Sequence, residues 1–119
     1  MRLLFVTVSR SDFSILNRLI KQTEKNKFFD TRILVTGEHL SKKMGYTKNE
    51  ILKNFKNKNY ILKIKDTLLS RPKDILLKAS IILKLTTVYI KKTKPELIVL
   101  LGDRYEVFHF AFAAWYNAF

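Results

Sequence analysis

The sequence predicts an α/β fold, a Rossmann-like parallel sheet with flanking helices, in one domain over residues 1–119. Short apolar segments alternate along the chain with longer segments in which apolar residues recur at helical spacing. The run of five aliphatic residues at 97–101 has no polar alternation, which is typical of a strand covered on both faces. Strands that alternate with helices favour parallel pairing through right-handed crossovers.

Four strands are expected at the short apolar segments 2–8, 32–36, 60–64 and 97–101, the third nearer a sheet edge because it alternates polar and apolar residues. Helices are expected over 14–26, from Thr47 onward, over 72–92 and over 105–119. Thr47 and Glu50 match a capping box, and Pro72 suits a first helical turn. Residues 9–13 are expected to form a polar loop, and residues 38–47 a loop or a short helix.

The last segment, 105–119, is apolar nearly all round if it is helical, and such a helix is normally buried on most sides. Neither a capping glycine nor a covering strand follows it. We therefore expect the chain to be the amino-terminal piece of a longer protein, as a truncated reading frame or a fragment. A partner chain that buries this surface is the alternative.

The charge balance is strongly basic, with 23 Lys and Arg against 10 Asp and Glu and a net charge of +13. Basic chains attract nucleic acid, anionic membranes or phosphorylated ligands. No RNP-like segment, helix-turn-helix spacing or zinc pattern is present, so we interpret the excess as solvated lysines and expect no nucleic-acid partner. A non-catalytic basic module that binds nucleic acid or an anionic membrane stays open as an alternative, through Lys73, Lys78, Lys84, Lys91 and Lys92.

Several classes of protein are disfavoured by what the sequence lacks. There is no cysteine, which excludes disulfides and thiolate chemistry. Neither a G-x-G-x-x-G segment nor a P-loop occurs, which argues against a nicotinamide dehydrogenase. The acidic residues and His39 fall in no metal-ligand spacing, so we expect neither a metal nor a cofactor. No signal peptide and no uncharged apolar stretch of about 18 residues is found, so a cytoplasmic protein without membrane contact is expected.

Three loops follow the predicted carboxyl ends of three strands, at residues 9–13, 37–41 and 102–106. In a doubly wound sheet such loops converge on one crevice, where ligands bind. Arginine suits a phosphate, neighbouring carboxylates suit proton transfer, and histidine titrates near neutrality. The candidate site residues are therefore Arg10, Asp12, His39, Asp103, Arg104 and Glu106.

Each of these residues also has a structural interpretation. Asp12 or Asp103 can cap the helix that follows it, and Arg104 can be a surface residue. His39 can be a loop histidine with satisfied hydrogen bonds. Glu106, one turn into a helix, can simply interact with the helix dipole.

Four segments, in order along the chain, resemble motifs of the UDP-N-acetylglucosamine 2-epimerases, especially the hydrolysing branch of the sialic-acid pathway. T-V-S-R-S-D-F at 7–13 is similar to T-x-S-R-A-D-[FY], with Ser11 in place of the commoner alanine. V-T-G-E-H-L at 35–40 resembles V-T-G-x-H-L, and G-Y-T-K-N-E-I at 45–51 resembles G-x-T-x-x-E-I. L-L-G-D-R-Y-E at 100–106 resembles V-L-G-D-R-x-E.

The resemblance implies the incomplete amino-terminal domain of a GT-B type fold, with the carboxy-terminal domain absent. It implies that UDP-GlcNAc, or a related UDP-2-acetamido sugar, is converted to the C2 epimer (ManNAc in the first case) and UDP. In this reaction UDP is eliminated with loss of the C2 proton, and water then adds to the glycal. No cofactor is implied. Similar enzymes are often dimers or tetramers, so the resemblance implies a homo-oligomer for the full-length protein.

The motif matches also imply roles for individual residues. Asp103 is the first choice for acid/base or charge-stabilising catalysis, and the family's histidine-x-glutamate-glycine-glycine segment would lie beyond Phe119. We therefore expect the chain to be inactive alone. A fragment of a GT-B glycosyltransferase is the other enzymatic alternative. The implied catalytic residues are Asp103, Asp12 and His39, and the implied substrate-binding residues are Arg10, Arg104 and Glu106.

Overall fold

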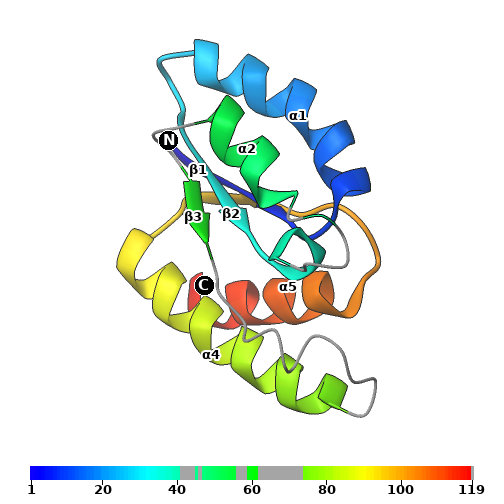
Figure 1. Ribbon diagram of the computed structural model, residues 1–119. Coiled ribbons are helices and arrows are strands. Elements are labelled where there is room, and N and C mark those ends of the chain that lie inside the picture. Colours follow the sequence, from blue (N-terminus) through cyan, green and yellow to red (C-terminus); the bar gives the residue numbers. More distant parts are fainter. Residues whose placement is uncertain (41–44, 46, 56–58, 62–73, 119) are drawn as a thin grey trace.

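The computed structural model describes residues 1–40, 45, 47–55, 59–61 and 74–118. The predicted alternation of strands and helices is confirmed (Figure 1). Residues 62–64 of the predicted third strand, and Pro72 with its predicted place in a helical turn, lie outside the described residues. The elements are β1 (Arg2–Thr7), α1 (Arg10–Lys25), β2 (Asp30–Val35), the short 3-10 helix η1 (Gly37–Leu40), α2 (Lys48–Asn54), β3 (Asn59–Ile61), α4 (Ile75–Thr93), β4 (Leu97–Val99) and α5 (Tyr105–Ala118).

The four strands form one parallel sheet in the order β3-β2-β1-β4. The chain steps outward from β1 to β2 to β3, and then crosses to the other side of β1 to form β4. The connection therefore changes direction between β1 and β4, which makes their carboxyl ends the topological switch point where α/β sheets bind ligands. The predicted fold class and the edge position of β3 are confirmed.

Helices cover the two faces of the sheet separately, with α1 and α2 on one face and α4 and α5 on the other (Figure 1). Side chains of β1 alternate between the two cores, because successive residues of a strand point to opposite faces. Leu3 and Phe5 pack into the α1–α2 core, and Leu4 and Val6 into the α4–α5 core. β1 is thus the buried centre of the fold, and the cores on both faces of the sheet hold it in place.

The expectation that residues 97–101 are buried on both faces is met in part. Val99 and Leu101 pack against the α1–α2 core and Ile98 and Leu100 against the α4–α5 core, but none of the five residues is fully buried. Leu97 is 47% exposed, and Ile98, Val99, Leu100 and Leu101 are only partly buried. The reason is that β4 lies at the edge of the described sheet, with β1 as its one neighbour there.

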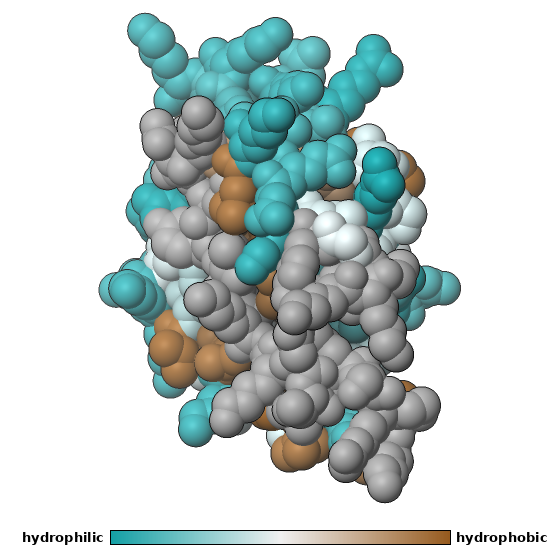
Figure 2. All heavy atoms as spheres, in the orientation of Figure 1, coloured by the Kyte–Doolittle hydropathy of each residue, from teal (hydrophilic) through white to brown (hydrophobic). Residues whose placement is uncertain are grey.

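Among the described residues, the last helix is buried on one side only. Val107, Phe110, Ala113 and Ala114 are buried, and α5 packs on α4, but no described element covers the opposite side of α5. Figure 2 shows further exposed apolar residues over α4, while hydrophilic residues gather over α1 and α2. Among the described residues, no helix is long and apolar enough to cross a membrane. The exposed aromatic residues of α5 are Phe108, Phe112, Trp115 and Tyr116.

One helix start and one helix cap differ from the prediction. Residues 10–13 belong to α1 and not to a loop, because the extended Ser9 is the N-cap and its Oγ accepts a hydrogen bond from the Asp12 N–H at 3.3 Å. Asp12 is therefore the acidic residue of the first turn and not the cap. Thr47 does precede α2, but it makes no side-chain cap bond, so the expected capping box does not form.

Candidate functional site

The structure brings the segments that follow β1, β2 and β4 together at the end of the sheet where the strands have their carboxyl ends. Gly102, after β4, lies against α1, since a Cβ on this glycine would be 3.4 Å from Oδ1 of Asp12. Arg104 donates a hydrogen bond from Nη1 to Oε1 of Glu38, which follows β2. We call this end of the sheet the carboxyl rim, and it consists of Arg10, Asp12, Glu38, His39, Asp103, Arg104 and Glu106.

Two glycines shape the carboxyl rim. Gly37 has φ +63°, and a Cβ there would lie 2.8 Å from the carbonyl oxygen of Val8. The N–H of Glu38 donates to that same carbonyl at 2.8 Å, so the turn after β2 lies directly on the end of β1. Gly102, with φ +104°, turns the chain after β4 toward α1. Because other residues rarely adopt these angles, glycine is what permits both close approaches.

His39 is fully buried and bonded through both ring nitrogens. Nε2 lies 2.8 Å from Oγ1 of Thr7, and Nδ1 lies 2.7 Å from Oγ1 of Thr47. The Thr7 hydroxyl donates to the Ser9 carbonyl at 3.4 Å, so it accepts from Nε2–H, and Nδ1 accepts from Thr47. Burial lowers the pKa of His39 to about 4, against the opposing effect of the Asp12 charge. The ring is therefore neutral at pH 7, as in a loop histidine with satisfied hydrogen bonds.

Arg104 lies among three carboxylates of the carboxyl rim. The hydrogen bond to Glu38 is the main cause that raises the pKa of Arg104, and the charges of Glu38, Glu106 and Asp12 raise it further. Oδ2 of Asp12 and Oε2 of Glu106 are buried, and neither has a hydrogen-bond partner among the described residues. The rim thus offers two free carboxylate acceptors beside a guanidinium that is already engaged.

Tyr105, the first residue of α5, interacts with Glu106 of the carboxyl rim. Burial is the main cause that raises the pKa of Tyr105 to about 12, and the charge of Glu106 and a hydrogen bond to it add to the shift. At pH 7 the phenol is protonated and donates to Glu106. Oε2 of Glu106 nevertheless has no hydrogen-bond partner among the described residues.

Two predicted site residues lie on the outside of the carboxyl rim. The Arg10 side chain is 78% exposed, and its Nε is 3.9 Å from Oε2 of Glu50. Asp103 is exposed at the turn after Gly102. Sequence reasoning missed Glu38 and Thr7. Thr7 had a signal, as the first residue of an epimerase-like motif, but Glu38 fills that family's variable position and had none.

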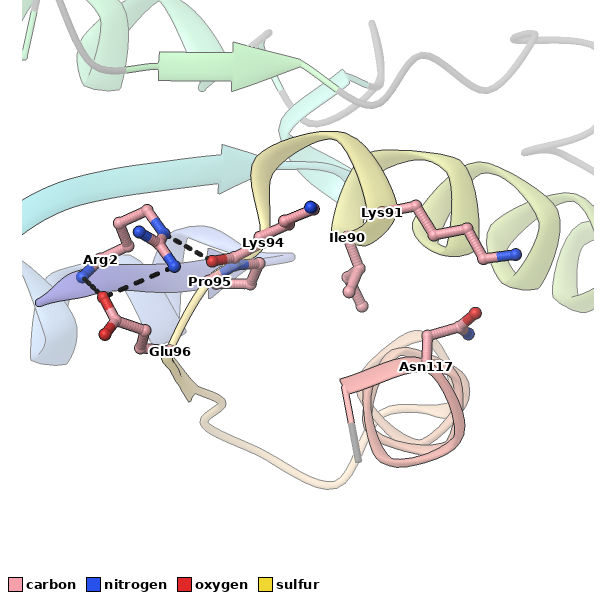
Figure 3. A pocket seen from close by; sticks show the side chains of 7 residues that line it. All are labelled: Arg2, Ile90, Lys91, Lys94, Pro95, Glu96 and Asn117. Atoms are coloured by element: carbon pink, nitrogen blue, oxygen red, sulfur yellow. Dashed lines mark hydrogen bonds and ion pairs between the residues drawn. The ribbon is translucent and has the colours of Figure 1, made fainter.

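The opposite end of the sheet holds a cavity of about 490 Å³ (Figure 3). Arg2 dominates it, with Nε donating to the Lys94 carbonyl at 2.6 Å and the backbone N–H donating to Oε2 of Glu96 at 2.7 Å. This cavity lies at the amino ends of β1 and β4, and none of the six candidate residues of the sugar-nucleotide site lines it. Among the described residues, no group of three or more acidic, histidine or cysteine side chains is placed to hold a metal. The lining residues are Arg2, Ile90, Lys91, Lys94, Pro95, Glu96 and Asn117.

The model of a protein family described as UDP-N-acetylglucosamine 2-epimerase matches residues 21–119. A GDP/UDP-N,N'-diacetylbacillosamine 2-epimerase (hydrolyzing) of Campylobacter jejuni is 32% identical over 108 residues, which cover 89% of this chain and 27% of that protein. A UDP-N,N'-diacetylbacillosamine 2-epimerase (hydrolyzing) of Legionella pneumophila is 30% identical over 115 residues, covering 95% and 30%. The polysialic acid biosynthesis protein P7 of Escherichia coli is 29% identical, covering 95% and 29%.

Solved structures show the same fold. A UDP-GlcNAc 2-epimerase from Neisseria meningitidis bound to UDP-GlcNAc matches with a TM-score of 0.76 at 23% identity, covering 98% of this chain and 30% of that one. A co-structure of S. aureus MnaA with UDP matches with a TM-score of 0.73 at 23% identity, covering 98% and 28%. The predicted fold, that of the amino-terminal part of GT-B-like epimerase structures, is confirmed. The chain spans less than a third of the length of each of these proteins.

Proposed function

Because the chain belongs to the UDP-N-acetylglucosamine 2-epimerase family, we propose that it supplies the sugar-facing half of a hydrolysing 2-epimerase site. The substrate is UDP-GlcNAc or a related UDP-2-acetamido sugar, and the products are its C2 epimer and UDP. The names of the Campylobacter and Legionella relatives support the hydrolysing reaction. Since the chain spans 27% and 30% of those two relatives, we also propose that turnover requires a further domain and that this chain alone is inactive.

The observation that carries the proposal is the charge and burial of the carboxyl rim. Although the chain has a net charge of +13, the carboxyl rim contains four carboxylates and only two guanidinium groups. Such a surface disfavours a diphosphate but stabilises a sugar ring that becomes cationic as its C1–O bond breaks. The free oxygens of Asp12 and Glu106 suit the hydroxyl and N–H donors of an N-acetylated sugar.

In the proposed reaction, the electron pair of the breaking C1–O bond leaves with UDP. Asp103 takes the C2 proton, and a double bond forms between C1 and C2 of the sugar. Water then adds its oxygen at C1, and a proton returns to C2 on the opposite face, which inverts that centre. Asp12 and Glu106 hold the sugar, Arg10 and Arg104 orient it, and neutral His39 fixes the loop beside them.

The other functions considered have less support. In the basic-module alternative, Lys78 was to contact nucleic acid or membrane, but this lysine is buried. Lys73 lies outside the described residues. No observation specifically favours a glycosyltransferase, and its product would differ, since the sugar would stay bonded to an acceptor.

The proposal is tested by joining this chain to the part of the Campylobacter jejuni relative that lies outside the matched region. We expect the chimera to release UDP and a free amino sugar from UDP-GlcNAc or UDP-N,N'-diacetylbacillosamine. Asp103→Asn should slow UDP release by at least about a hundredfold, because a positioned proton acceptor contributes that much. The control is Glu96→Gln at the other end of the sheet, which should leave the rate unchanged. A chimera that unfolds cooperatively but releases no UDP from either sugar nucleotide would contradict the proposal.

A further inference from the structure

The bond between Glu38 and Arg104 spans the carboxyl rim. Glu38 follows β2 and Arg104 follows β4, while β1 lies between these two strands. The bond therefore passes over the carboxyl end of β1, at the switch point where a ligand of this fold would sit. It joins residues 66 positions apart in the chain.

Both ends of this bond are anchored by the backbone. The N–H of Glu38 donates to Val8, and the preceding Gly37 has no room for a side chain. The Arg104 carbonyl accepts from the Phe108 N–H at 3.2 Å, in the first turn of α5. The two side chains are still 31% and 40% exposed, so a ligand can reach them. The backbone hydrogen bonds fix the main chain of both residues, while the charged groups of their side chains stay accessible.

We propose that Glu38 is a specificity-determining residue, which holds Arg104 away from ligand phosphates so that the carboxyl rim accepts an uncharged N-acetylated sugar instead. The inference rests on the proposed function, because it assigns the halves of a UDP-sugar to different surfaces. A phosphate that enters the rim must displace Glu38 and approach Asp12 and Glu106 as well. Uncharged hydroxyl and N–H groups meet no such competition.

If Glu38 and Arg104 formed an ordinary surface ion pair, removing it would change the stability of the protein slightly and would leave ligand binding unchanged. A residue that competes with the ligand's anion must instead change affinity for anions selectively. The two accounts therefore differ in binding and not in stability.

The experiment compares Glu38→Gln with Glu96→Gln by calorimetric titration at fixed ionic strength. Both variants change the net charge equally, and both break a partly exposed Arg–Glu pair, but Glu96 lies at the opposite end of the sheet. The probes are UDP, inorganic pyrophosphate and N-acetylglucosamine, and circular dichroism checks the fold of each variant. We expect Glu38→Gln to bind UDP and pyrophosphate about fivefold tighter or more, as one freed ion pair allows. N-acetylglucosamine should bind Glu38→Gln and Glu96→Gln equally.

The added variant Glu38→Gln with Arg104→Gln should lose the gain, because Arg104 is the group released. Equal affinities of Glu38→Gln and Glu96→Gln for both anions, within about twofold, would overturn the inference, and so would undetectable anion binding by both. The proposed function is judged separately, by UDP release from the chimera. An active chimera whose Glu38→Gln variant gains no anion affinity would refute the role of Glu38 alone.

Discussion

The two ends of the sheet are each closed by an Arg–Glu pair, but the pairs have different surroundings. At the amino ends, Arg2 and Glu96 are about half exposed, 3.8 Å apart, and border an open cavity. At the carboxyl ends, the Arg104–Glu38 pair lies beside buried His39, two unpartnered carboxylate oxygens and two glycine turns.

This difference distinguishes an ordinary surface ion pair from a functional site. A solvated pair is screened and contributes little, so the Arg2–Glu96 pair needs no functional explanation. Buried polar groups without partners and positive φ angles cost stability, and such costs concentrate at functional sites. The carboxyl rim is therefore the better site, although the 490 Å³ cavity lies at the other end.

The strongest test of this contrast is Gly37→Ala. The new Cβ would lie 2.8 Å from the Val8 carbonyl oxygen, and residue 37 would have to keep a φ of +63°. We expect a loss of about 3 kcal/mol in the free energy of unfolding, measured in urea, from the clash and the strained angle together. Gly45→Ala is the control, because φ is +78° there but nothing lies within 4 Å of the new Cβ, so about 1 kcal/mol of strain is expected. Equal losses would mean that the close approach to β1 has no energetic weight.

The second test concerns His39 and pH. The pKa of His39 is about 4 when folded, below its ordinary value of 6.5, so the unfolded chain binds the proton more readily. The contribution of the neutral ring is complete above pH 6.5 and is lost as the pH falls toward 4, by about 3 kcal/mol in all. Urea unfolding between pH 7.5 and 4 measures it, as the difference between the wild type and His39→Gln. A pH-independent difference would show that the histidine is protonated equally in both states.

The smallest expected effect separates two buried threonines. Thr7→Val removes the hydroxyl that accepts from His39 Nε2–H and leaves the Ser9 carbonyl as the acceptor for the ring, so a loss of about 1 kcal/mol is expected. Thr31, in β2 toward its amino end, is also buried, but its hydroxyl has no partner among the described residues. Thr31→Val should therefore be neutral or stabilising in the same unfolding assay. The opposite ranking would contradict the hydrogen-bond assignment at His39.

Much of the fold was predictable because it depends on local pattern. Apolar segments marked the four strands, and the rule that parallel strand ends converge placed Arg10, Asp12 and Asp103 at one edge. The start of α1 was misplaced although its signal was present. Ser9 with Asp12 three residues later is an N-cap pattern, but the polar run 9–13 also fits a loop.

Burial was less predictable, since it depends on what stands beside an element. The run 97–101 and helix α5 are apolar enough for a core, but the sequence does not show which neighbours cover them. The Glu38–Arg104 bond was not predictable either. It depends on the strand order, which brings two residues together that no local spacing relates.

The central place of β1 has a consequence for how the chain folds. β1 pairs with β2 across about 28 residues, as at Leu3↔Thr31, but with β4 across about 94, as at Leu3↔Leu97. The second pairing closes a far longer loop and forms more slowly. During synthesis the β1–α1–β2 unit can assemble early, while the other side of β1 stays unpaired until β4 has been made. Chaperones that shield apolar strands would act in that interval.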